Sequence, residues 1–196
     1  MRRLLAAACA CAVAFVAGVY APNSMAEEAP PPPPTTTAPE PETDIGDYLL
    51  GEIAKARRET WRWERLMRVP LTQARRIAER SNEREHRLLI LKGWRQQAAK
   101  RRRQAQRPPF RSAWLCIYRH ERHPRMGWRT VTGNGFFGGL QMDMSFQRVY
   151  GADLLRKKGT ANRWTALEQI WVAVRAHRAG RGFYPWPNTA RYCGLI

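Results

Sequence analysis

Residues 112–141 read SAWLCIYRHERHPRMGWRTVTGNGFFGGLQ. Ile117 and Tyr118 lie three and four residues after Trp114, a spacing that predicts an amphipathic helix. Ser112 is a suitable N-cap for it, and the pattern ends at about Arg122. The glycines that follow, interleaved with aromatic residues, are typical of a tight turn or hairpin.

The same periodicity extends over most of the remaining chain. Thr165 and Glu168 form a capping-box pattern, and Gly180 stands where a helix commonly ends. Helices are predicted over 46–67, about 71–106, 112–122, 145–150, 153–158 and 165–179. We therefore expect an all-α fold with one short Gly-rich hairpin or turn. A short turn at Pro70 predicts that the first two helices form an antiparallel hairpin.

Composition divides the 196 residues into four parts. These are a signal peptide (1–26), a Pro-rich linker (27–44), a basic helical hairpin (45–109) and a small C-terminal domain (110–196). Arg2 and Arg3 precede a short apolar stretch that ends in small residues. A membrane anchor is the alternative, although the apolar stretch is short for one. We expect secretion, association with the cell wall, and no stable membrane span after cleavage.

The net charge of +18 is distributed unevenly. Residues 27–44 hold five acids and no base, whereas residues 45–109 hold 18 bases and 7 acids, a net of +11. Such a charge favours anionic partners. The basic run Lys100–Arg103 either binds a polyanion or forms a solvated helix face. The hairpin as a whole either binds an anionic wall polymer or packs on the C-terminal domain.

Four cysteines suggest one disulfide. Cys9 and Cys11 lie in the expected signal peptide, which leaves Cys116 and Cys193. Two cysteines in an exported chain predict a bridge, closing a loop of about 78 residues and contributing roughly 4 kcal/mol in the chain-entropy model. Two separate free thiols are the alternative.

Glu121 is the candidate for acid chemistry. It lies seven residues after Trp114 and four after Ile117, at the end of an apolar helix stripe. A partly desolvated carboxyl is favoured in its protonated form, which can donate a proton to a leaving group. Glycosidic bond cleavage needs such a donor. Nearby arginines leave open that Glu121 is a helix-end acid paired with one of them.

The segment WLCIYRHE (114–121), then Trp128, then TGNGFFGGLQMD (132–143), resembles the transglycosylase-like domain of resuscitation-promoting factors. The resemblance covers about residues 111–195. It implies a lysozyme-like fold that cleaves the glycan strands of bacterial peptidoglycan. The family's catalytic glutamate maps onto Glu121, and the Gln of its Gly-Gly-Leu-Gln segment maps onto Gln141.

The resemblance also implies that Asn134 and Gln141 contact the sugar. The other residues expected in the substrate site are Phe136, Phe137, Asp143, Trp128 and Trp186. The aromatic side chains suit sugar stacking, and the glycines beside them are expected to let a ligand approach the backbone. The family's Cys before the catalytic glutamate is replaced by His120, so the disulfide shifts one helical turn, to Cys116.

Counting acids limits the mechanism. The C-terminal domain holds only Glu121, Asp143, Asp153 and Glu168. We favour Glu121 as acid and then base on the β-1,4 MurNAc–GlcNAc bond, with Asp143 as a helix N-cap rather than a nucleophile. No cofactor or metal is expected, because the histidines and cysteines show no zinc spacing. The alternatives are a non-catalytic wall-binding protein and, from charge alone, a nucleic-acid-binding protein, which export disfavours.

Overall fold

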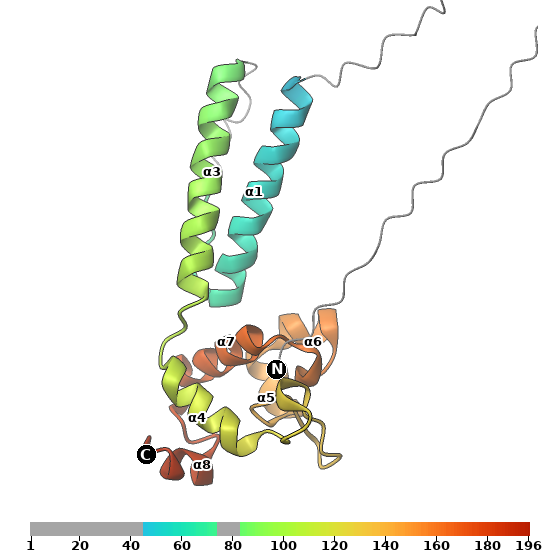
Figure 1. The fold of residues 1–196 in the computed structure, drawn as a ribbon, viewed down its shortest axis with the longest axis vertical. Helices are drawn as coiled ribbons and strands as arrows, with labels where there is room; N and C mark the ends of the chain where they lie inside the picture. The colour runs from blue at the N-terminus through green and yellow to red at the C-terminus, as the bar shows by residue number, and fades with distance from the viewer. Residues whose placement is uncertain (1–44, 74–82) are drawn as a thin grey trace, which may run out of the picture. The chain divides into compact units, whose positions relative to one another are not determined.

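The computed structural model describes residues 45–73 and 83–196, all within one compact unit, Pro41–Ile196. The expected signal peptide and linker lie outside the described residues. The fold is predominantly helical, as predicted (Figure 1). The helices are α1 (Ile45–Met67), α3 (Arg84–Ala105), α4 (Arg111–Glu121), α5 (Met144–Tyr150), α6 (Ala152–Lys158), α7 (Ala166–Ala176) and α8 (Pro187–Tyr192).

The helix pair, α1 and α3, runs parallel, so the predicted antiparallel hairpin is wrong (Figure 1). Glu52 of α1 pairs with Arg95 of α3 at 2.7 Å, and further along both helices Glu64 pairs with Arg101 at 2.8 Å. The 16 residues from 68 to 83 allow this arrangement. At up to ~3.3 Å per residue they reach farther than the ~34 Å length of α1.

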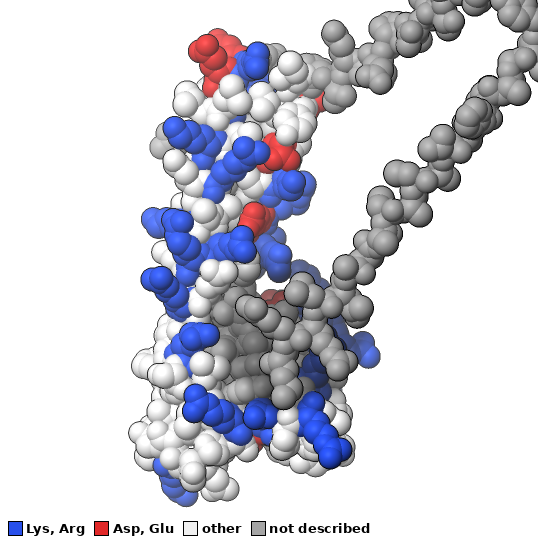
Figure 2. All heavy atoms as spheres, viewed as in Figure 1, with Lys and Arg blue, Asp and Glu red and all other residues white. Residues whose placement is uncertain are grey.

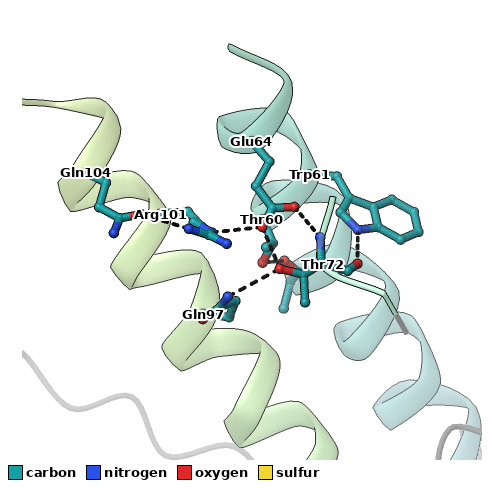
Figure 3. Close-up of polar contacts among 8 residues, drawn as sticks. Thr60, Trp61, Glu64, Thr72, Gln97, Arg101 and Gln104 are labelled. Carbon is teal, nitrogen blue, oxygen red and sulfur yellow. Dashed lines mark hydrogen bonds and ion pairs between the residues drawn. The ribbon is translucent and has the colours of Figure 1, made fainter. Parts of the chain in front are cut away.

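A buried carboxylate holds the first described residues after α1 (Figure 3). Glu64 is fully buried and accepts hydrogen bonds from the Thr72 backbone N–H at 2.9 Å and from the Thr72 hydroxyl at 2.5 Å. The Trp61 indole donates to the Thr72 carbonyl at 2.8 Å. Residues 71–73 are not helical, so the helix predicted to start at Leu71 is wrong there. Residues 74–82, which belong to the same predicted helix (about 71–106), lie outside the described residues.

Helix α7 lies at the centre of the core. Its capping box is present as predicted, and residues Gln169–Ala176 are all buried. Arg175, only 4% exposed, donates to the carbonyls of Leu66 and Tyr150 at 2.9 Å each and pairs with Asp153. Burial lowers the pKa of the Arg175 guanidinium, an effect that Asp153 opposes. Arg175 thereby ties the end of α1 to the C-terminal core.

The expected Gly-rich hairpin is present. β1 (Phe136–Phe137) pairs antiparallel with β2 (Met142–Asp143) across a Gly138–Gln141 turn. The preceding helix α4 is capped by Phe110 in the left-handed region, not by Ser112, so that detail of the prediction is wrong. None of the helices in the described residues is both long and apolar enough to span a membrane.

Candidate functional site

Glu121 is the last residue of α4, on the face that the helix turns toward the core. Trp114 and Ile117, on the same stripe, are fully buried, and Glu121 is half-buried. The apolar spacing therefore places this carboxyl at the edge of the core, as the periodicity predicted. Arg119, which lies off the stripe, is exposed.

The Glu121 carboxylate is hydrogen-bonded but not ion-paired. The Thr189 hydroxyl of α8 donates to Glu121 Oε1. Within residues 45–73 and 83–196, no Lys, Arg or His lies within ion-pair distance of this carboxylate. The Arg122 guanidinium instead lies 5.4 Å from the Tyr118 ring centroid. The alternative in which Glu121 is a helix-end acid paired with an arginine is therefore not seen among the described residues.

The predicted disulfide joins Cys116 to Cys193 and explains how Thr189 reaches Glu121. Cys193 follows directly after α8, so the bridge holds α8 against α4. Thr189 is four residues before Cys193, and Glu121 is five residues after Cys116. Thr189 was missed from the sequence, although it and Glu121 each lie little more than one helical turn from a bridged cysteine.

His120 lies next to the disulfide. Its ring contacts Tyr192, with ring centroids 4.2 Å apart. One ligand atom each from Cys116, His120 and Cys193 falls within a 4.8 Å cluster, a grouping that the sequence analysis did not foresee. Metal binding by cysteine requires thiolates, and both sulfurs are used in the disulfide. With the disulfide formed, His120 is therefore the one residue of this cluster that could ligate a metal ion.

Two of the predicted sugar contacts, Asn134 and Gln141, share one hydroxyl. Thr132 Oγ1 hydrogen-bonds Asn134 Oδ1 and lies 3.2 Å from Gln141 Oε1. Gln141 Nε2 donates to the Gly138 carbonyl at 2.8 Å. The turn backbone and Thr132 thus orient both amide side chains, and Thr132 is a member of this cluster that the sequence analysis missed.

A cavity of about 310 Å³, here called the Trp186 groove, gathers four predicted residues. Phe136, Gln141, Asp143 and Trp186 all line it, together with Arg181 and Tyr184 among others. Phe136 and Tyr184 are well exposed, at 40% and 69%. Glu121 is not one of the residues that line this groove. The groove combines exposed rings, one amide and one carboxylate, a lining that suits a sugar.

Asp143 is a helix N-cap, as predicted. Its Oδ1 accepts a hydrogen bond from the Phe146 backbone N–H at 2.7 Å, at the start of α5. Trp186 is 5% exposed, and its indole donates to the Leu140 carbonyl at 2.6 Å. Each of these groove residues therefore also has a structural role in the fold.

Trp128 and Phe137 lie against the core, and neither lines the Trp186 groove. The Trp128 ring stacks on Tyr118, with centroids 3.9 Å apart and planes 6° from parallel. A Cβ on Gly139 would come within 2.6 Å of Tyr118 and 2.9 Å of Trp128. A Cβ on Gly138 would meet Gln169 Oε1 at 2.5 Å. These two buried glycines accommodate neighbouring side chains, not the approach of a ligand.

Compared with known proteins, the chain matches no family model, no curated protein and no solved structure.

Proposed function

We propose that the chain is an exported enzyme with a lysozyme-like domain that cleaves the β-1,4 MurNAc–GlcNAc bond of peptidoglycan. The observation that carries this proposal is the state of Glu121: half-buried, bonded to a hydroxyl, and without a cationic partner among the described residues. In a domain with 14 bases and 4 acids, a half-buried carboxyl that is paired with none of the described cations is available as a proton donor.

In the proposed reaction, Glu121 donates its proton to the glycosidic oxygen as the bond breaks. It then takes a proton from the group that attacks C1. Asp143 is occupied as a helix cap, which supports a single-carboxylate mechanism over one with a protein nucleophile. The N-acetyl group of the substrate stabilises the positive charge that develops. Attack by the 6-hydroxyl of muramic acid then gives a 1,6-anhydro end without water.

The rings and amides near the Gly-rich turn support a sugar substrate. Phe136 and Tyr184 are exposed on the Trp186 groove, and Gln141 joins that groove to the Thr132–Asn134 cluster. The disulfide supports export, because such bonds persist in oxidising compartments. The expected wall location follows from the substrate.

A non-catalytic wall-binding protein is the second candidate. It is favoured by one observation, that Glu121 does not line the groove which gathers Phe136, Gln141, Asp143 and Trp186. In this alternative, the groove holds a sugar that the protein never cleaves.

Dye release from stained, purified sacculi separates the two candidates. The wild-type chain releases dye, Glu121→Gln does not, and Glu85→Gln, the same change at an exposed acid on α3, behaves as wild type. If the folded wild-type chain sediments with sacculi but releases no dye, the enzyme proposal fails and the wall-binding candidate stands.

A further inference from the structure

The helix pair carries two hollows, and Glu121 lines neither of them. One, of about 420 Å³, is lined by both helices, including Ala56 of α1 and Arg95, Arg102 and Arg103 of α3. The other, of about 390 Å³, is lined from residues 88–99 of α3. Neither belongs to the site described above.

The two hollows adjoin. Arg95 and Ala99 line both of them, so the hollows form one open surface, here called the α3 track. Its lining runs from Leu88 to Gln106, and at 1.5 Å of rise per residue these two positions lie about 27 Å apart along the helix. A surface of this length suits an extended chain molecule better than a single small anion.

The α3 track is basic. Its lining holds four bases, Lys92, Arg95, Arg102 and Arg103, and one acid, Glu59 of α1, a net of +3. Arg95 is held in place by Glu52 at 2.7 Å. Arg102 and Arg103 are exposed, and in the part of the chain that the structure describes no acid lies within ion-pair distance of either. Figure 2 shows Lys and Arg side chains spread over the helix pair, with few acidic ones between them.

The lining also indicates what kind of polyanion fits. Guanidinium groups bind phosphates through paired hydrogen bonds. Proteins that bind single-stranded nucleic acid add aromatic rings on which bases stack. None of the residues that line the two hollows is aromatic, and Leu88, Leu91 and three alanines provide a smooth aliphatic floor. Phosphate and aliphatic contacts are therefore available, but base stacking is not.

We propose that the α3 track binds a linear polymer of phosphates joined by short polyols, the chemistry of anionic wall polymers. This binding does not depend on Glu121 or on glycan cleavage. It gives the exported chain a second attachment to the wall, through charge instead of sugar recognition.

The test is fluorescence anisotropy of the full chain with a labelled glycerol-phosphate oligomer, over a series of salt concentrations. Arg102→Gln/Arg103→Gln is expected to weaken binding about tenfold at 150 mM salt. It is also expected to flatten the slope of log affinity against log salt by about 1.4, for two lost phosphate contacts. Ala99→Glu, which adds an acid where the two hollows meet and removes no base, is expected to weaken binding as well.

The matched control is Arg156→Gln/Lys157→Gln, which removes the same charge from exposed positions on α6. It is expected to bind within about twofold of wild type, since distant exposed charges are largely screened. The proposal is overturned if the control loses as much affinity as the α3 variant, or if Ala99→Glu binds like wild type. It is also overturned if oligothymidine with equal phosphate count binds more tightly than the glycerol-phosphate oligomer. Circular dichroism checks that each variant keeps its helices.

Discussion

The hydroxyl of Thr189 donates a hydrogen bond to the carboxylate of Glu121, 68 residues away in the sequence. This contact joins α8 to the end of α4, and the nearby Cys116–Cys193 bridge holds the two segments together. A hydrogen bond from a hydroxyl orients the carboxyl without placing a positive charge beside it, and a fixed orientation toward the leaving group is what a proton donor to a sugar requires.

Thr189 is expected to act as a positioning residue. Thr189→Val keeps the shape of the side chain but removes the hydroxyl, so glycan cleavage should fall roughly tenfold, equivalent to about 1.4 kcal/mol of the barrier. Thr189→Ser restores the hydroxyl and should recover most of that activity. Dye-release rates on sacculi measure both variants. Equal impairment of the Val and Ser variants would show that the methyl packing matters and the hydrogen bond does not.

Asp143 distinguishes a one-carboxylate from a two-carboxylate mechanism. Asn is as good an N-cap as Asp, so Asp143→Asn should keep both the stability of α5 and most of the cleavage activity. Asp143→Ala removes the cap and should cost about 1 kcal/mol of unfolding free energy. Urea unfolding and dye release provide the two readouts. A stable Asp143→Asn protein as inactive as Glu121→Gln would assign Asp143 a direct part in the chemistry.

Gly139 is expected to be required for packing. Gly139→Ala pushes a methyl group into the Tyr118–Trp128 stack and should lower the unfolding free energy by about 1–3 kcal/mol. Gly51→Ala is the control: this exposed helical position has nothing within 4 Å, and it should gain roughly 0.5–1 kcal/mol. Urea denaturation measures both. A neutral Gly139→Ala variant would mean that the stacked rings can move aside at no cost.

Arg101 compensates the buried charge of Glu64. Arg101→Met leaves that carboxylate without its cation and should cost about 3 kcal/mol of unfolding free energy. Arg102→Met, next to it but exposed, should change the unfolding free energy by less than about 0.5 kcal/mol. The same unfolding experiment compares the two. Similar values for both variants would show that the Thr72 hydrogen bonds suffice for Glu64.

The periodicity of the sequence predicted most helices because an apolar stripe is a local signal. It located α1 (Ile45–Met67), the capping box at Thr165 and the N-cap at Asp143, all within a few residues. The direction of α3 relative to α1 cannot be read from a local sequence pattern. It depends on the path of the chain between the two helices, of which the structure describes residues 68–73, with Thr72 bonded to the buried Glu64.

The sequence identified residues of the candidate site but not how they lie relative to one another. Glu121 and the disulfide followed from helix spacing and from cysteine counting. The role of Gly138 and Gly139 did not, because a glycine required for a neighbouring ring or amide looks the same in sequence as one that admits a ligand. The buried contacts of Arg175 were also missed, since nothing in its local sequence separates it from the exposed arginines around it.

Mass spectrometry of the soluble fragments released from purified sacculi tests the central claim most directly. The account predicts disaccharide-peptides with 1,6-anhydro ends from the wild-type chain and from Glu85→Gln, and none above background from a folded Glu121→Gln variant. Release of the same fragments at the same rate by Glu121→Gln would contradict it, because the bond would then be broken without the carboxyl assigned to break it.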